Sequence, residues 1–222
     1  MLSPGDAAAL ENLGIRTVFD LRTQAEIVAQ PDRLPAEVEY VGLDILADAT
    51  GAGPARLMGA LGDPAAARDM LADGRAERMF IDGYRSIVSL PSARSGYRRL
   101  FSDLTAPAKT PALFHCTTGK DRTGWAAAAL LMLAGVSDDD VMSEYLLTNE
   151  QLVPQLGPML AVFEAAGGDR DLLLPIVGVQ PKYLNAALDE MRFRFGTIDG
   201  YFTEGLEMDA AAQDTLRSTL VQ

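Results

Sequence analysis

The sequence is poor in several residue types, and each scarcity narrows what the protein can be. It holds one cysteine in 222 residues, so no internal disulfide can form and a reducing compartment suits it. Its 19 basic residues face 31 acidic ones, and the net charge of −12 argues against nucleic-acid partners and against broad attachment to anionic membranes. The longest apolar run, 125–136, is too short to span a bilayer. We therefore predict a cytoplasmic protein with no nucleic-acid partner and no integral membrane association.

Length and the alternation of patterns predict the fold. No linker or repeat divides residues 1–222, which predicts a single domain. Ser3 is expected to cap the first helix and Gly14 to end it. Apolar runs predict strands at 15–21, 39–45 and about 112–115. Helices are expected at 3–13, 75–90, 95–104 and 125–133, and residues 141–222 are expected to be mostly helical and to form an outer layer. Such alternation indicates an α/β fold with a central, mostly parallel sheet flanked by helices.

The run 115–124 (HCTTGKDRTG) carries the chemistry. A buried strand is expected before it and a helix after it, so a tight loop meets a helix N-terminus. Backbone N–H groups that turn inward there, together with the helix dipole, favour an oxyanion. The residues expected to bind phosphate are Thr117, Thr118, Gly119, Lys120, Asp121 and Arg122.

Each residue type in this run has a chemical reason. Cys116 is the candidate nucleophile, because N–H donors, a helix N-terminus and a guanidinium favour its reactive thiolate form. Arg122 offers a planar fork that can hold two phosphoryl oxygens through the transition state. Gly119 permits backbone geometry that a Cβ would obstruct. Thr123 can place a hydroxyl near the sulfur, and His115 is expected to orient the loop through its ring nitrogens.

This run resembles the Cys-x5-Arg-Ser/Thr signature of the protein tyrosine phosphatase superfamily. With 13–22 (LGIRTVFDLR), it resembles the bacterial tyrosine phosphatases related to the mycobacterial secreted enzyme and its Listeria relative; 181–184 and 196–201 resemble that family's C-terminal helices. The resemblance covers most of the chain. It implies a tyrosine phosphatase-like fold and a reaction through a phosphocysteine intermediate, without metal or cofactor. It also implies phosphotyrosine proteins or phosphoinositides as substrates and inorganic phosphate as product or bound anion.

The general acid has two candidates, because the chain has no Trp-Pro-Asp loop. The resemblance implies Asp121, within the loop itself. Asp44 is the other candidate, since it follows the second predicted strand at the end where parallel strands commonly deliver site residues. Either carboxylate could instead be structural, and Asp121 could simply pair with its basic neighbours.

The resemblance assigns further roles. A basic residue at the position of Lys120 is linked in the family to phosphoinositide substrates, with a solvated lysine as the alternative. Residues 47–74 match the place of a helical lid, with an ordinary surface excursion as the alternative. Tyr84 and Arg85 could line the substrate mouth or merely pack and face water. Relatives in pathogens can be exported without an obvious signal, so export stays an alternative to the cytoplasm. Family members usually begin with an additional segment before the first helix, so we expect a short chain or a misplaced start at Met1.

Other interpretations of the motifs are weaker. A nucleotide-binding Walker loop is discounted, because position 114 is Phe and Lys120 is followed by Asp. The acidic triplet 138–140 is explained better by helix capping than by a metal site. Two functional classes remain: a cysteine-dependent phosphatase, and a catalytically silent module that recognises phosphate. Retention of Cys116, Arg122 and Thr123 together favours the enzyme.

Overall fold

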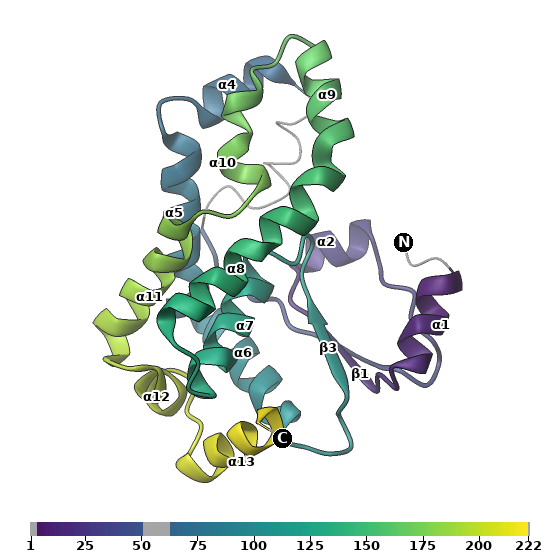
Figure 1. Cartoon of the computed structure of the whole chain (residues 1–222), viewed down its shortest axis with the longest axis vertical. Coiled ribbons are helices and arrows are strands. Elements are labelled where there is room, and N and C mark those ends of the chain that lie inside the picture. The colour runs from purple at the N-terminus through teal and green to yellow at the C-terminus, as the bar shows by residue number, and fades with distance from the viewer. Residues whose placement is uncertain (1–3, 51–62, 222) are drawn as a thin grey trace.

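Three parallel strands form the sheet, as the sequence predicts. The computed structural model describes residues 4–50 and 63–221, and its strands lie in the order β2-β1-β3. Figure 1 labels β1 and β3 of this sheet. Their bounds are β1 Thr17–Asp20, β2 Glu39–Gly42 and β3 Ala112–His115. The first two are shorter than the predicted runs because the chain leaves the sheet once pairing ends. The α/β fold with a parallel sheet flanked by helices is thereby confirmed.

The strand register decides where the site forms. All four residues of β1 are buried because it is the central strand, whereas β2 lies at an exposed edge. Asp20 is level with Gly42 on one side and with His115 on the other. The residues that follow β1 and β3 therefore leave the sheet at the same edge, where parallel strands usually present functional residues.

Helices make up most of the rest of the described chain. Those before β3 are α1 Pro4–Asn12, α2 Gln24–Ala29, α4 Pro64–Leu71, α5 Arg75–Ser89 and α6 Pro91–Leu104. Those after β3 are α7 Arg122–Leu133, α8 Asp138–Leu152, η1 Val153–Leu156, α9 Gly157–Ala165, η2 Arg170–Leu172, α10 Leu174–Val177, α11 Pro181–Phe195, α12 Ile198–Gly200, the π-helical turn η3 Tyr201–Gly205 and α13 Ala210–Leu220. Within the described ranges, none has the length and apolar character needed to cross a bilayer.

Local signals explain most of these boundaries. Gly14, which follows α1, has a φ of +66°, a conformation that glycine adopts without strain. Ser137 caps α8 by accepting a hydrogen bond from the N–H of Asp140, so the acidic triplet is a capped first turn. The predicted cap Ser3 lies outside the described residues. Helix α2 is an addition to the predicted set, and it shapes the site.

The main core surrounds α7, and it corrects one prediction. Trp125 on α7 is fully buried and donates a hydrogen bond from Nε1 to the hydroxyl of Tyr201 at 3.1 Å. Tyr183 and Phe202, also from the C-terminal third, are fully buried as well. The prediction that residues 141–222 form an outer layer is therefore wrong in part. These aromatic side chains are core material, because α7 needs apolar partners on the side away from the sheet.

A second apolar cluster lies at one end of the molecule, where α4, α9 and α10 come together (Figure 1). Ala67 and Leu71 of α4 pack there with Leu160 and Phe163 of α9. The lid predicted at 47–74 falls partly on this cluster and partly on 51–62, which lie outside the described residues. The described helix of this segment, α4, is therefore anchored by its own apolar face.

Candidate active site

The loop that the sequence predicts to bind phosphate occupies residues 116–121, between β3 and α7. Cys116, its first residue, is 6% exposed. Gly119 has a φ of +72°, so the loop uses the left-handed conformation that glycine permits. Helix α7 begins at Arg122, and its N-terminus therefore adds partial positive charge at the loop. This is the strand, loop and helix order that the sequence predicts.

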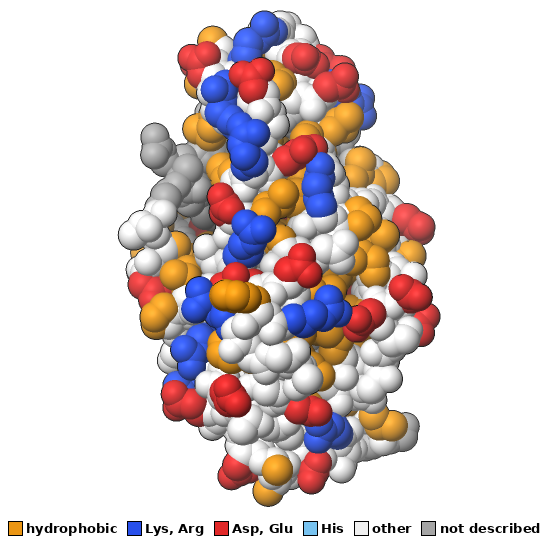
Figure 2. All heavy atoms as spheres, turned by 90° about the vertical axis from the view of Figure 1, so that its left-hand side faces the viewer, with side chains coloured by type: hydrophobic (Ala, Val, Ile, Leu, Met, Phe, Trp, Pro, Cys, Tyr) orange, Lys and Arg blue, Asp and Glu red, His pale blue; other side chains and the backbone are white. Residues whose placement is uncertain are grey.

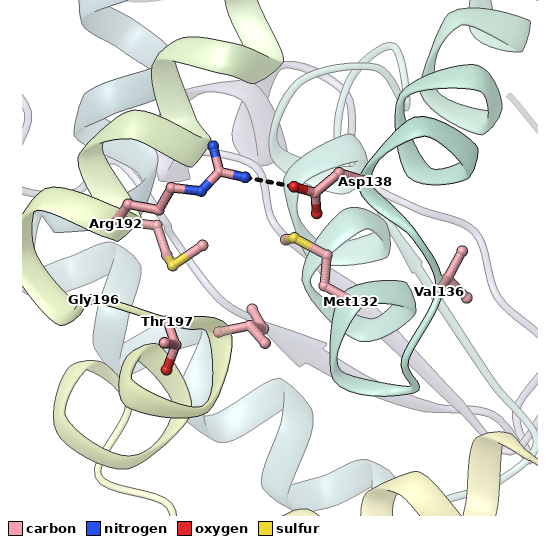
Figure 3. A pocket seen from close by; sticks show the side chains of 8 residues that line it. Met132, Val136, Asp138, Arg192, Gly196 and Thr197 are labelled. Atoms are coloured by element: carbon pink, nitrogen blue, oxygen red, sulfur yellow. Dashed lines mark hydrogen bonds and ion pairs between the residues drawn. The ribbon is translucent and has the colours of Figure 1, made fainter.

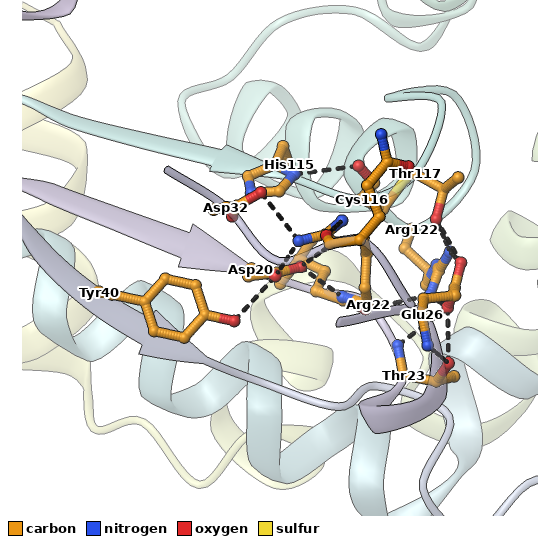
Figure 4. Close-up of polar contacts among 12 residues, drawn as sticks. Asp20, Arg22, Thr23, Glu26, Asp32, Tyr40, His115, Cys116, Thr117 and Arg122 are labelled. Carbon is orange, nitrogen blue, oxygen red and sulfur yellow. Dashed lines mark hydrogen bonds and ion pairs between the residues drawn. The ribbon is translucent and has the colours of Figure 1, made fainter. Parts of the chain in front are cut away.

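Arg122 is held at the loop by Glu26 of α2 (Figure 4). Its Nη1 donates to Glu26 Oε2 at 2.8 Å and its Nη2 to Glu26 Oε1 at 2.8 Å, a bidentate pair. Nη1 also donates to the carbonyl of Leu21 at 3.3 Å, and Nη2 to Thr117 Oγ1 at 3.3 Å. Among the described residues, Nε–H has no hydrogen-bond partner. The Nε edge of the guanidinium is therefore the one left for a ligand.

Glu26 is itself fixed by the start of α2. It forms a capping box with Thr23, whose backbone N–H and hydroxyl donate to Glu26 Oε2 at 2.9 and 2.7 Å. Thr117 donates its hydroxyl to the other carboxylate oxygen. Burial opposes ionisation of Glu26, but its hydrogen bonds with Arg122 and the charge of that guanidinium outweigh burial and lower the pKa of Glu26 to about 2.

The pKa of Arg122 shifts in the opposite direction. Burial opposes its charge, but the hydrogen bonds with Glu26 and the nearby charge of Cys116 raise the pKa of Arg122 above its ordinary value. The guanidinium thus stays charged beside the thiol, where a charged donor stabilises an anionic ligand.

Replacing Glu26 by glutamine should change how stability depends on pH. A carboxylate whose pKa falls from 4.5 to about 2 on folding stabilises the protein above pH 4.5. That stabilisation is lost as the pH drops towards 2, and it amounts to on the order of 3 kcal/mol. Urea unfolding of Glu26→Gln at a series of pH values should show lower stability near neutrality and a flatter decline below pH 4.5 than wild type. Glu11→Gln, which removes an exposed carboxylate of α1, is the control. An unchanged pH slope for Glu26→Gln would contradict the assignment.

A chain of polar contacts orients His115 (Figure 4). The Nδ1 of His115 lies 3.0 Å from the carbonyl oxygen of Cys116, and its Nε2 lies 2.9 Å from Asp32 Oδ2. Arg22 bridges Asp32 and Asp20 through Nη2, at 2.9 and 2.7 Å. Tyr40 donates its hydroxyl to Asp20 at 2.9 Å. These contacts fix the imidazole against the loop backbone, which fits the predicted orienting role of His115.

The same set of contacts includes three side chains that could together hold a metal ion. Ligand atoms of Asp20, Asp32 and His115 lie within 4.8 Å of one another. The guanidinium of Arg22, however, already contacts both carboxylates. Burial opposes the charge of Asp20, but hydrogen bonds from Arg22 and Tyr40 lower the pKa of Asp20 below its ordinary value. The positive charge that these carboxylates need is supplied by arginine.

Lys120 and Asp121 are held by groups beyond the loop. Lys120 is 4% exposed, so the alternative of a solvated lysine is wrong. Its Nζ donates to the carbonyl of Gly178 at 3.2 Å, lies 3.3 Å from Asp121 Oδ1 and sits 4.3 Å from the centre of the Phe80 ring. Asp121 accepts a hydrogen bond from the hydroxyl of Tyr84 at 2.8 Å. Asp121 therefore pairs with Lys120 and also has a neutral partner.

Three other predicted site residues lie in different settings. Asp44 accepts hydrogen bonds from the backbone N–H groups of Gln24 at 2.9 Å and Leu46 at 3.0 Å, so both of its oxygens are engaged. The hydroxyl oxygen of Thr123 is buried and has no partner among the described residues. Thr118 is exposed at the loop tip.

Tyr84 and Arg85 are neighbours on helix α5, but their side chains lie in different surroundings. Tyr84 is 1% exposed and donates a hydrogen bond to Asp121, so it contacts the loop but is too buried to line an open substrate mouth. Arg85 is exposed and pairs with Asp82 at 3.3 Å. On the outer face near α4, α5 and α11, basic and acidic side chains are interspersed (Figure 2). Arg85 itself is half exposed and has an acidic partner on its own helix, so it is not a residue of the loop.

A separate pocket of about 250 Å³ opens at the other end of α7 (Figure 3). Its lining includes Met132 and Met191, with the ion pair of Arg192 and Asp138 at 2.6 Å beside them. Met132 lies ten residues beyond Arg122, about 15 Å along the helix. This pocket is therefore distinct from the loop.

Some residues of the site are absent from the sequence-based predictions. The sequence-based predictions gave no role to Glu26, Asp32 or Tyr145. Glu26 contacts Arg122 and Asp32 contacts His115, whereas Tyr145 contacts Tyr84. The one available signal was the Thr-x-x-Glu spacing of Thr23 and Glu26, which is typical of a capping box.

Known proteins place the chain in a family. The sequence profile of the tyrosine phosphatase family matches residues 1–222. The triple specificity protein phosphatase PtpB of Mycobacterium tuberculosis is 29% identical over 228 residues, covering 91% of this chain and 81% of that protein. A Cupriavidus necator protein, named provisionally as a tyrosine-protein phosphatase, is 36% identical over 117 residues, covering 52% of this chain and 43% of its own. A tyrosine-protein phosphatase of Nostoc commune is 29% identical over 156 residues, covering 69% of this chain and 47% of its own.

The chain thus spans less than half the length of the Cupriavidus and Nostoc relatives in the matched regions, and most of the length of the mycobacterial one. The match to the family profile, in contrast, runs over residues 1–222 of this chain. Together with the loop geometry, this match establishes that the chain belongs to the tyrosine phosphatase family.

Proposed function

We propose that residues 1–222 form a single phosphatase domain that hydrolyses phosphomonoesters through a phosphocysteine intermediate on Cys116, without a metal ion. The observation that carries the proposal is the bidentate pair of Arg122 with Glu26, which leaves the Nε edge free beside a buried cysteine. A guanidinium fixed in this way is preorganised for the charge that develops on a phosphoryl group. The single thiol favours a reducing compartment, and we propose the cytoplasm as its location.

The first step uses Cys116 as nucleophile. Its thiolate attacks phosphorus while the bond to the leaving oxygen breaks, and the phosphoryl group passes to sulfur. Arg122 and the backbone N–H groups of 117–122 would bind the three non-bridging oxygens, supported by the N-terminus of α7. Thr123, whose buried hydroxyl has no partner among the described residues, is suited to donate a hydrogen bond to the sulfur when it leaves in the second step.

Asp121 is the better candidate for the general acid. It lies in the loop itself and is partly exposed, so a leaving oxygen can reach it. Asp44 already accepts a backbone N–H at each oxygen and caps the start of α2, which is a structural task. In the proposal, Asp121 protonates the leaving oxygen, and its carboxylate then takes a proton from the water that releases phosphate.

The proposed substrate class is broad, with phosphotyrosine preferred. PtpB of Mycobacterium tuberculosis is named a triple specificity phosphatase, which supports activity on more than one phosphoester. Lys120 is the family-implied contact for phosphoinositides, but its amine already binds Gly178 and Asp121. An inositol phosphate would have to displace these contacts. We therefore expect lipids to be poorer substrates.

This order of substrate preference can be checked by comparing turnover at matched concentrations. The substrates are a phosphotyrosine peptide, a phosphoserine peptide and an inositol phospholipid. The phosphotyrosine peptide should be hydrolysed fastest, because its long aryl group reaches a buried nucleophile without contacting Lys120. A clear advantage for the lipid would overturn the proposed preference and would indicate that Lys120 leaves Gly178 when a lipid binds.

The test of the function itself is phosphate release from phenyl phosphate in the presence of EDTA. Wild type should remain active, and rapid acid quenching should trap one phosphoryl group on Cys116, seen by peptide mass spectrometry. Inactivity of a folded protein that still binds vanadate would point to a phosphate-recognition module. Activity lost on adding EDTA would contradict the metal-independent reaction.

A further inference from the structure

The hydroxyl of Tyr84 lies between Asp121 and a second tyrosine. Its Oη is 2.8 Å from Asp121 Oδ1 and 2.6 Å from the Oη of Tyr145. The three residues come from α5, the catalytic loop and α8, and they are 37 and 61 positions apart along the chain. Tyr84 and Tyr145 are 1% and 2% exposed, so both phenols are buried beside a carboxylate that is not.

The direction of these hydrogen bonds follows from the donors available. A carboxylate only accepts, so Tyr84 gives its single proton to Asp121. Tyr84 can then only accept from Tyr145, which makes Tyr145 the donor of the second bond. Burial, followed by the charges of Asp121 and Tyr145, raises the pKa of Tyr84 well above its ordinary value, and burial raises that of Tyr145. Both hydroxyls therefore stay protonated.

The two oxygens of Asp121 are left in unequal settings. Oδ1 accepts from Tyr84 and also lies 3.3 Å from the Nζ of Lys120. An oxygen that faces two donors is a poor place for a proton, because the proton would displace one of them. Among the described residues, Oδ2 has no hydrogen-bond partner. A proton on Asp121 is therefore best accommodated on Oδ2.

We propose that Tyr84, supported by Tyr145, is a positioning residue that directs the catalytic proton of Asp121 to Oδ2 and aims that oxygen at the leaving group. The inference rests on the proposed function. In the first step, the Oδ2 proton moves to the leaving oxygen as the P–O bond breaks and the S–P bond forms. In the second step, Oδ2 accepts a proton from a water molecule whose oxygen bonds to phosphorus as the S–P bond breaks. This step releases phosphate, returns the Cys116 thiolate and restores the acid.

Packing makes this arrangement rigid. The ring of Tyr84 meets that of Tyr145 edge-on, with centroids 6.2 Å apart, and lies 5.8 Å from the ring of Tyr183. Tyr183 gives its own hydroxyl to the carbonyl of Pro175 at 2.7 Å. It is therefore a matched control: a buried tyrosine that touches Tyr84 and whose hydroxyl bonds elsewhere.

The test compares Tyr84→Phe, Tyr145→Phe and Tyr183→Phe on two aryl phosphates. Phenyl phosphate has a poor leaving group that needs protonation, whereas the dinitrophenolate of 2,4-dinitrophenyl phosphate leaves without it. Tyr84→Phe should lower kcat/KM about ten-fold on phenyl phosphate and hardly at all on the dinitrophenyl ester. The ten-fold loss is a fraction of what a full general acid contributes. Tyr145→Phe should show the same selectivity with a smaller loss. Tyr183→Phe should leave the ratio of the two rates at its wild-type value.

A double-mutant cycle separates positioning from general damage. In an Asp121→Asn background, Tyr84→Phe should cause no additional loss on phenyl phosphate, because its effect passes through the acid. An equal loss on both esters, or an additive loss in the double variant, would overturn the inference. Should Tyr84→Phe fail to fold, the selectivity of Tyr145→Phe decides. Inactivity of wild type on both esters would instead contradict the proposed function.

Discussion

Replacing Cys116 by serine is expected to lower phosphate release by at least about a thousand-fold. Serine keeps the size of the side chain but is a far weaker nucleophile at neutral pH, since its hydroxyl does not ionise there. Among the described residues, no general base is hydrogen-bonded to the Cys116 side chain that could activate a hydroxyl in its place. The measurement is kcat for phenyl phosphate in EDTA, with protein concentration checked by active-site titration of the wild type.

The same variant should keep its binding function. Arg122, Glu26 and the loop backbone are untouched by the change, so inorganic phosphate should still protect the protein against thermal unfolding. This protection is the control for a correctly formed loop. Retention of more than about a tenth of wild-type activity by Cys116→Ser would rule out the cysteine as nucleophile. A variant that neither unfolds cooperatively nor binds phosphate would be replaced by Cys116→Ala, which removes the sulfur without adding a polar group to a buried position.

The sequence was most informative where local signals and tertiary structure agree. β3 has the predicted bounds, and the loop with α7 follows it, because the apolar run, the glycine at 119 and the helix-forming stretch act over neighbouring residues. The ends of β1 and β2 were predicted too long. Strand propensity continues well after Asp20 and Gly42, whereas pairing continues only as single backbone hydrogen bonds from Leu21 and Leu43.

Helix α2 shows why the remaining part of the site could not be predicted. It is six residues long and has no buried residue, so it carries no apolar periodicity that would reveal it. Its contact with Arg122, through Glu26, depends on the parallel register that sets Asp20 level with His115. Tyr145 is a similar case, because its contact with Tyr84 exists only once α5 and α8 have packed. Such contacts belong to the tertiary fold.

These contacts divide the site into fixed and free edges. Arg122 is fixed through its two terminal nitrogens, His115 through both ring nitrogens, and Asp121 through Oδ1. Of these three side chains, Arg122 keeps Nε and Asp121 keeps Oδ2 without a partner among the described residues. A phosphomonoester needs two such groups: one for its non-bridging oxygens and one for its leaving oxygen. The protein contacts thus leave one free edge for each requirement of the proposed reaction.

Arg122→Lys should therefore reduce kcat/KM by about a hundred- to a thousand-fold although it keeps the positive charge. The guanidinium makes two bonds to Glu26 and still presents Nε to a ligand, whereas one ammonium cannot serve both directions. The lysine should pair with the partly buried Glu26 and leave the phosphoryl oxygens to the backbone alone. The loss should be similar for phenyl and dinitrophenyl phosphates, because charge stabilisation at phosphorus does not depend on the leaving group.

An equal loss of kcat/KM on both esters distinguishes the role of Arg122 from that of Tyr84. Tyr84→Phe should lower kcat/KM on phenyl phosphate but not on the dinitrophenyl ester. Arg85→Lys, a change of the same chemistry at an exposed position on α5, should leave both rates near wild type. Phosphate protection against thermal unfolding should weaken in Arg122→Lys, since the same edge binds the product. If Arg122→Lys keeps its activity within about ten-fold of wild type, the charge alone is sufficient and the fork held by Glu26 is not what stabilises the transition state. A strong loss of kcat/KM together with unchanged phosphate binding would instead show that Arg122 acts on the transition state only. That result would give stronger support to preorganisation of Arg122 by Glu26.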